Sequence, residues 1–194
     1  MDLVVIMGPQ AVGKMTVGRE LEKKVDAKLL HNHETIDLFA KFLGYGKETF
    51  RLSDQTRKEL FKAFVSNEQN VTKSIIFTVV VAFDLIEDID FLTEISEIFL
   101  DGHGRVFFIE LEADLDTRLQ RNIGESRLEA KPSKRNIEFS RNELLTTHEK
   151  HRLNSLPSEV TEKIPQVNYL KINNTHLEAE EVADRIAEFV QHNG

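Results

Sequence analysis

The 194-residue chain contains no cysteine and no tryptophan. The absence of cysteine excludes a disulfide framework and every metal site that depends on thiolate ligands, and it leaves the redox compartment open. Long apolar runs are also absent. The longest, residues 75–83, is interrupted by Thr78 and falls far short of the ~20 residues that a membrane-spanning helix needs. No basic segment precedes an apolar core at the N-terminus, so we expect a cytoplasmic protein without a signal peptide.

Positive charge is scarce. The chain has 25 Lys and Arg residues against 33 Asp and Glu residues, and its formal net charge is −8. Because phosphate neutralisation supplies most of the affinity of general nucleic-acid binders, we expect no nucleic-acid partner, and we expect no membrane partner either. The length suits one well-buried core, so we predict a single domain over residues 1–194. The composition leaves the oligomeric state undetermined.

Short apolar runs alternate with stretches of helical periodicity along the whole chain. The apolar runs predict strands at residues 3–7, 28–30, 75–83, 105–109 and 168–172. Apolar residues three or four apart predict helices at residues 14–25, 34–43, 85–100, 137–151 and 177–190, with further helices capped by Ser53 or Asp54 and by Asp114. This alternation predicts an α/β fold of three layers, with about five parallel strands between helices.

A glycine-rich turn lies between the first predicted strand and the first predicted helix. Its sequence is Gly8-Pro9-Gln10-Ala11-Val12-Gly13-Lys14-Met15-Thr16. Gly8 and Gly13 permit a backbone that turns amide groups inward, and the helix N-terminus behind them favours anions. Lys14 adds a full positive charge for the outer phosphates. The segment is therefore predicted to bind a nucleoside triphosphate, with Lys14 in a catalytic role. The alternative is an ordinary tight turn.

Met15 occupies the position where most phosphate-binding loops carry a hydroxyl that ligates Mg²⁺. A thioether does not bind a hard cation that prefers oxygen. The metal is therefore held by water, by substrate phosphates and by a distant carboxylate, or its binding is impaired. The candidate protein oxygens for such indirect binding are those of Thr16 and Asp84.

Gly-Pro followed by Gly-Lys-X-Thr resembles the small-molecule kinases of the nucleoside monophosphate kinase and shikimate kinase type, and the similarity covers the element order of the whole chain. The resemblance implies a P-loop NTPase fold, ATP and Mg²⁺ as cofactors, and phosphoryl transfer to a small polar acceptor. Adenylate kinases have Gly-Lys-Gly-Thr at this point, which implies that Thr16 meets the α-phosphate and that Mg²⁺ is largely water-ligated. The alternative functions are a P-loop ATPase and a nucleotide-binding protein without an acceptor.

A basic segment follows the fourth predicted strand. Its cations are Arg118, Arg121, Arg127, Lys131, Lys134 and Arg135. In the kinases that the chain resembles, a mobile lid lies here, at about residues 118–136. That resemblance implies that Arg118 or Arg121 packs on the adenine and that Arg127 reaches the transferring phosphate. The alternative is a solvated helix end with ion pairs. Asn173 and Asn174 follow the last predicted strand, where similar kinases line the adenine pocket; a plain turn is the alternative.

The acceptor is expected to meet residues 31–70. His31-Asn32-His33 end the second predicted strand, with Asp37 soon after, and a histidine there could orient or deprotonate a hydroxyl. The alternative is a helix-capping loop with Asn32 as the N-cap. Arg57, like Arg51, could supply positive charge to an anionic acceptor or be a structural surface residue.

Asp84 follows the longest predicted strand. Its carboxylate could hold a metal-bound water or accept the proton of the acceptor, or it could cap the helix that begins near Leu85. Shikimate kinases usually carry Asp-x-Asp where this chain has residues 31–33, and nucleoside monophosphate kinases usually carry an arginine within the helix at 34–43. The chain has neither, so the acceptor is not identified.

Overall fold

The structure is a computed structural model, which describes residues 1–123 and 137–193. Its centre is a five-stranded sheet in the order β2-β3-β1-β4-β5, and all neighbouring strands are parallel. The strands are β1 (Asp2–Met7), β2 (Ala27–His31), β3 (Ser74–Val79), β4 (Arg105–Glu112) and β5 (Asn168–Asn173). The predicted α/β class with about five parallel strands between helices is confirmed.

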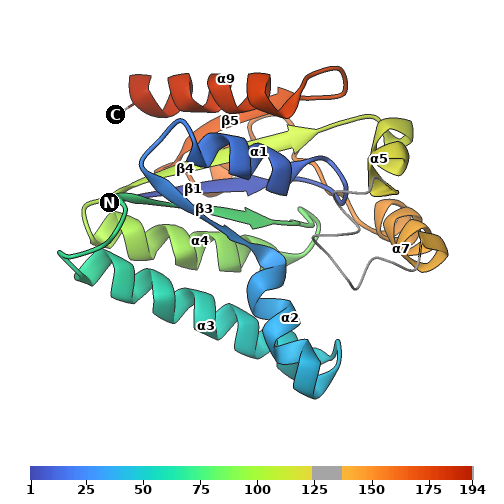
Figure 1. Ribbon diagram of the computed structural model, residues 1–194, viewed down its shortest axis with the longest axis horizontal. Coiled ribbons are helices and arrows are strands. Elements are labelled where there is room, and N and C mark those ends of the chain that lie inside the picture. Colours follow the sequence, from blue (N-terminus) through green and yellow to red (C-terminus); the bar gives the residue numbers. More distant parts are fainter. Residues whose placement is uncertain (124–136, 194) are drawn as a thin grey trace.

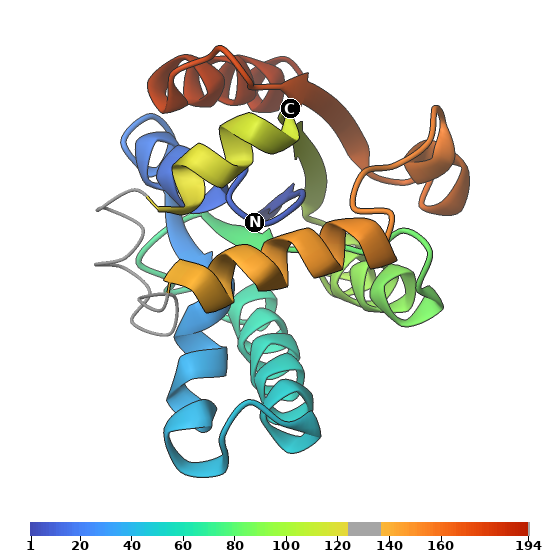
Figure 2. The same ribbon diagram turned by 90° about the vertical axis from the view of Figure 1, so that its right-hand side faces the viewer.

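Helices cover both faces of the sheet. They are α1 (Lys14–Glu22), α2 (Asn32–Leu43), α3 (Lys47–Ser66), α4 (Ile86–Asp101), α5 (Leu115–Asn122), α7 (Ile137–Lys150), α8 (Glu159–Lys163) and α9 (Ala179–His192). Figure 1 shows α1 and α9 on one face and α3 and α4 on the other. Helices α5 and α7 cross the end of the sheet at which the strands finish (Figure 2). In the described part of the chain, no helix is long and apolar enough to cross a membrane.

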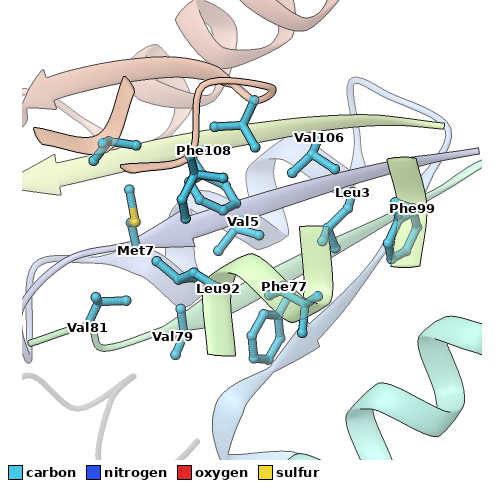
Figure 3. Close-up of a cluster of buried hydrophobic side chains, with 14 of the residues drawn as sticks. Leu3, Val5, Met7, Phe77, Val79, Val81, Leu92, Phe99, Val106 and Phe108 are labelled. Atoms are coloured by element: carbon cyan, nitrogen blue, oxygen red, sulfur yellow. The ribbon is translucent and has the colours of Figure 1, made fainter. Parts of the chain in front are cut away.

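The sequence of β1 explains why this strand lies at the centre. Leu3, Val5 and Met7 point into the core beneath α3 and α4, which Figure 3 shows in close-up. Val4 and Ile6 point to the opposite face, into the core beneath α1 and α9. All five side chains are at most 1% exposed. A strand buried on both faces needs a continuous apolar run rather than an alternating one.

Two predicted boundaries differ most from those of the structure. The third predicted helix begins at Lys47 rather than at Ser53 or Asp54, because Ser53 is fully buried inside α3 and its hydroxyl lies 2.6 Å from that of Thr35 on α2. The strand predicted at residues 75–83 ends at Val79. Val81 to Phe83 stay buried but leave the sheet, since the Phe83 amide donates to the Arg152 carbonyl instead.

Candidate functional site

The glycine-rich segment forms a tight loop between β1 and α1. Its backbone takes positive φ angles at Gly8 (142°), Ala11 (61°) and Gly13 (108°). A Cβ at Gly8 would lie 2.3 Å from the carbonyl oxygen of Leu111, so only glycine fits beside the end of β4. Gly13 is the N-cap of α1, which places the positive end of that helix directly behind the loop.

Lys14 reaches back across this loop. Its ammonium donates hydrogen bonds to the carbonyl oxygens of Gly8 (2.6 Å) and Pro9 (2.7 Å). The charge is thereby held at the edge of the loop, beside the N-terminus of α1. A cation beside the N-terminus of a helix is an arrangement that favours the binding of an anionic phosphate chain.

Side chains from distant parts of the sequence hold the loop in place. Asn174 is only 3% exposed, and its side-chain amide donates a hydrogen bond to the backbone carbonyl of Val12 at 2.8 Å. Arg121 donates to the same carbonyl at 3.2 Å and to the Asn174 carbonyl at 2.9 Å. Arg118 is also buried, donates to the Gln10 carbonyl at 3.1 Å, and has its pKa lowered by burial. Three residues predicted to contact nucleotide therefore shape the loop that would bind it.

One pocket of about 780 Å³ extends from this loop across the end of the sheet. The described residues that line it on the loop side are residues 10–17, Arg19, Arg121, Asn174, Leu177, Glu178 and Ala179. Those that line its other part, called the acceptor end below, are Asn32, His33, Ile36, Tyr45, Phe50, Thr78, Val80, Phe139 and Glu143. The volume is near the upper end of the about 300–1,000 Å³ typical of small-molecule pockets.

A carboxylate organises the acceptor end. Asp37 lies 3.2 Å from Nδ1 of His33 and accepts a hydrogen bond from the Tyr45 hydroxyl at 3.0 Å. A carboxylate at Nδ1 favours the tautomer with its proton on that nitrogen, which makes Nε2 the basic atom of the ring. The Asn32 amide donates to the Thr78 hydroxyl at 3.3 Å, so the start of α2 is fastened to the end of β3.

Comparison with protein-family models and with curated proteins finds no match. Comparison with solved structures finds matches over almost the whole chain. The shikimate kinase of Acinetobacter baumannii in complex with shikimate is 19% identical, with a TM-score of 0.53 over 98% of this chain and 93% of that one. A sugar kinase from Janibacter sp. HTCC2649 is 14% identical, with a TM-score of 0.57 over 98% and 95%. The tunicamycin resistance protein of Deinococcus radiodurans is 16% identical, with a TM-score of 0.55 over 98% and 96%.

The fold is that of the P-loop kinases. Within this P-loop kinase fold, the residues predicted from the sequence divide into those that line the pocket and those that do not. Residues 10–16, Arg121, Asn174 and His33 line it, and Asp37 lies directly behind His33. His31 instead caps α2, where its backbone amide donates to Glu34 at 3.0 Å. Arg127 lies outside the described residues, as does most of the predicted lid.

The sequence offered Arg57 either as a positive charge for an anionic acceptor or as a structural surface residue, and the structure shows it buried. It is 3% exposed and donates hydrogen bonds of 2.8 Å to the Thr35 hydroxyl, to Asp54 and to the Asn32 carbonyl. Burial lowers its pKa to about 10, so the guanidinium stays charged at neutral pH. Arg57 therefore fastens α3 to the first turn of α2 and is not among the residues that line the pocket.

We expect Arg57→Lys to lower the free energy of unfolding by about 2–3 kcal/mol, because a lysine cannot serve three acceptors in the planar arrangement of a guanidinium. Urea denaturation measures the change. The matched control is Arg51→Lys on the exposed side of the same helix, where Arg51 pairs with Glu48 at 2.9 Å. The control should cost less than about 0.5 kcal/mol. Equal losses in the two variants would contradict the fastening role.

Asp84 does not line the pocket either. Its carboxylate accepts the Arg152 amide at 2.9 Å and lies 3.2 Å from Nδ1 of His151. Partial desolvation acts to raise the pKa of Asp84, but the hydrogen bonds from Arg152 and His151 outweigh it and hold the pKa below its ordinary value. Leu85, not Asp84, is the N-cap of α4. Asp84 therefore joins the turn after β3 to the turn after α7. Asn173, the last residue of β5, is not among the residues that line this pocket, and its side-chain oxygen accepts the Thr175 amide at 3.0 Å.

Sequence reasoning missed several residues of the pocket. Phe139 and Glu143 come from α7, far along the chain from the loop, and no local pattern distinguishes them. Tyr45 had a usable signal, because an aromatic residue between Gly44 and Gly46 in a turn between two helices is exposed unless something covers it. It is 57% exposed and lines the pocket.

A second missed feature is a buried carboxylate in the middle of β4. Glu110 is 0% exposed and accepts hydrogen bonds from Asn154 (2.8 Å), the Ser155 hydroxyl (2.5 Å) and the Tyr169 hydroxyl (2.8 Å). Lys171 lies 3.1 Å away. Burial acts to raise the pKa of Glu110, and the hydrogen bonds from Ser155, Asn154 and Tyr169 overcome it and hold the pKa below the ordinary value. This network ties β4 and β5 to the segment that follows α7.

Proposed function

We propose that the protein is an ATP-dependent phosphotransferase that acts on a small molecule. The observation that supports this most is a single pocket that joins an anion-binding loop to the Asp37–His33 pair. Solved structures with the same fold carry the names shikimate kinase and sugar kinase, which agrees with the proposal. Because ATP would be the phosphoryl donor, we also propose that the protein acts in the cytoplasm.

In this proposal the loop holds the triphosphate. The backbone amides of residues 10–16, which include the first turn of α1, bind phosphate oxygens. The Lys14 ammonium, now on the carbonyls of Gly8 and Pro9, offsets negative charge on the transferring group. Arg121 and Asn174 keep the loop in shape and line the side where the nucleoside would lie. Catalysis then rests on positioning and on preorganised charge.

His33 is the proposed base for the acceptor. Nε2 takes the proton of an acceptor hydroxyl as its oxygen bonds to the terminal phosphorus of ATP and the bond to the leaving ADP breaks. Asp37 fixes the histidine ring through Nδ1 and stabilises the imidazolium that forms. The geometry favours His33 over Asp84, because Asp84 is engaged by His151 and Arg152 outside the pocket lining.

Magnesium fits this site in an indirect manner. Among the described residues, no group of three or more His, Asp or Glu side chains could hold a metal ion. The Thr16 hydroxyl, which lines the pocket, is the protein oxygen that we propose for the metal or its water, with phosphate oxygens as the other ligands. When bound, the ion would neutralise charge on the phosphates. Arg127 stays a proposal for the transferring phosphate.

An ADP-release assay over sugars, polyols, nucleosides and aminoglycosides tests the proposal. A kinase forms one ADP for each acceptor molecule that it phosphorylates. Mass spectrometry detects the phosphorylated acceptor. ADP formation that no acceptor accelerates would favour a P-loop ATPase. A protein that forms no ADP but is thermally stabilised by nucleotide would be a binding module.

We expect His33→Ala to lower kcat by about 100-fold, since general base catalysis contributes roughly 10²–10⁴-fold. The KM for ATP should stay within about 2-fold, because the loop that binds phosphate is unaffected. His192→Ala, at the exposed end of α9, is the control and should behave as wild type. A variant that retains full kcat would exclude His33 as the base.

A further inference from the structure

A charged side chain lies buried behind the phosphate-binding loop. Arg118 on α5 is 3% exposed, and its Nε donates a hydrogen bond to the backbone carbonyl of Gln10 at 3.1 Å. Gln10 lines the pocket, whereas Arg118 does not. One residue of the loop therefore separates the guanidinium of Arg118 from the space in which a ligand of the loop would lie.

The charge of this guanidinium is not paired within the part of the chain that the structure describes. The hydrogen bond from Nε ends on a neutral carbonyl, and the Nη2 atom of Arg118 is buried without a hydrogen-bond partner. Burial lowers the pKa of Arg118, and no carboxylate of the described residues opposes that shift. An arginine nevertheless keeps its proton in a protein, so a full positive charge lies beneath the loop.

Arg57 shows how a buried arginine is accommodated elsewhere in the same molecule. It is also 3% exposed, but its guanidinium pairs with Asp54 at 2.8 Å and donates to two further acceptors. A buried cation without such a carboxylate gives up its hydration and regains little of the lost energy, which lowers the stability of the fold. Arg118 therefore destabilises the ligand-free protein in a way that Arg57 does not.

An anion bound in the loop would offset this destabilisation. Solvent and salt screen a buried charge weakly, so the field of Arg118 extends across the loop into the pocket. The phosphate chain of a nucleotide carries several negative charges. The field would therefore raise the affinity of the loop for phosphates, although no atom of Arg118 needs to touch them.

Building on the proposed function, we propose that Arg118 strengthens the binding of phosphate chains through its charge, from behind the loop, and that it lowers the stability of the ligand-free protein. In this role Arg118 is not a catalytic residue, and it does not pack on the adenine. The bound phosphate chain is the partner of its charge.

Arg118→Met tests the proposal, because methionine keeps a long apolar side chain and removes the charge. Calorimetry measures the binding of inorganic tripolyphosphate and of a non-hydrolysable ATP analogue, and thermal unfolding gives the melting temperature of the ligand-free protein. We expect both affinities to fall by at least about 10-fold and by a similar factor. We expect the melting temperature to rise by about 2 °C or more, since a buried unpaired charge is removed.

Two further variants separate the charge of Arg118 from its shape. Arg118→Lys keeps the charge and should keep both affinities within about 3-fold of the wild type. Arg185→Met removes a positive charge at an exposed position on α9, where Arg185 pairs with Glu181 at 2.8 Å, and should change neither the affinities nor the melting temperature. The ratio of wild-type to Arg118→Met affinity should be similar at low and at high ionic strength, because salt screens a buried charge little.

Three kinds of result would overturn the proposal. If Arg118→Met binds tripolyphosphate as the wild type does, or if the wild type does not bind it, the charge does not act on phosphates. A loss of affinity for the ATP analogue alone would place Arg118 at the nucleoside. A lower melting temperature in Arg118→Met, with an equal loss of affinity in Arg118→Lys, would mean that Arg118 only holds the loop in shape.

This inference and the proposed function fail separately. If no acceptor accelerates ADP release but Arg118→Met weakens phosphate binding as expected, phosphotransfer fails and the role of Arg118 stands. If an acceptor is phosphorylated while Arg118→Met keeps its affinity for tripolyphosphate, phosphotransfer stands and the role of Arg118 fails.

Discussion

Lys14→Ala is expected to lower kcat/KM for the phosphorylated acceptor by about 10²–10³-fold, which is the usual cost of removing one preorganised group that stabilises charge in the transition state. The ammonium is the cation that the structure holds at the edge of the phosphate-binding loop, on the carbonyls of Gly8 and Pro9. ADP formation measured with purified protein gives the change. The affinity for nucleotide, measured by calorimetry, should fall as well, because in the proposed function the ammonium would also contact ATP in the ground state.

The matched control is Lys23→Ala, at the opposite end of α1. Lys23 is 66% exposed and pairs only with Glu20 among the described residues, so its loss should leave activity unchanged. Both variants should keep the melting temperature within a few degrees, because neither side chain is part of the core. If Lys14→Ala and Lys23→Ala form ADP at the wild-type rate, the loop does not catalyse the reaction, and the proposed function is wrong.

The loop could be predicted from the sequence because all its signals are local. Two glycines at fixed spacing, a lysine and a strand before them are enough, and the structure places Gly8, Gly13 and Lys14 as that pattern requires. The strands could be predicted for the same reason, since residues buried on both faces of a sheet form continuous apolar runs. The predicted boundaries failed where tertiary contacts decide them, as at Val79.

The acceptor side could not be predicted to the same depth. Nothing in the sequence around Arg57 distinguishes it from a surface arginine. Only the packing of α3 against α2 shows that it is buried and has three hydrogen-bond partners. Asp84 directly follows the strand predicted from the sequence, a place where catalytic carboxylates are common, but in the structure β3 ends at Val79 and the backbone amide of Arg152, almost seventy residues later, donates to Asp84. Phe139 and Glu143 reach the pocket because α7 crosses the end of the sheet, a placement that no sequence window contains (Figure 2).

The second large effect is expected at Glu110, where the carboxylate is surrounded by donors. In Glu110→Gln, one carboxylate oxygen becomes an NH₂ group. At the Oε1 position it would face the Asn154 side-chain amide and the Ser155 backbone amide, which cannot accept, and at the Oε2 position it would face the Ser155 and Tyr169 hydroxyls; either orientation also removes the charge that pairs with Lys171. We expect the free energy of unfolding to fall by about 3–5 kcal/mol at pH 7, as for other broken buried ion pairs. Urea denaturation measures it. The control is Glu112→Gln. The Glu112 side chain is 35% exposed and also pairs with Lys171, so its replacement should cost less than about 1 kcal/mol.

The penalty of Glu110→Gln should also depend on pH. The pKa of Glu110 is held below its ordinary value of 4.5 in the folded protein, so the folded state binds the proton less readily than the unfolded state. The stabilisation that the carboxylate provides is therefore fully present above pH 4.5 and is lost as the pH falls through the folded pKa. The difference between wild type and Glu110→Gln should narrow as the pH falls below 4.5, while losses from other carboxylates cancel because both proteins carry them. A difference that stays constant between pH 7 and pH 3 would mean that packing, and not the charge of Glu110, holds β4, β5 and the segment after α7 together.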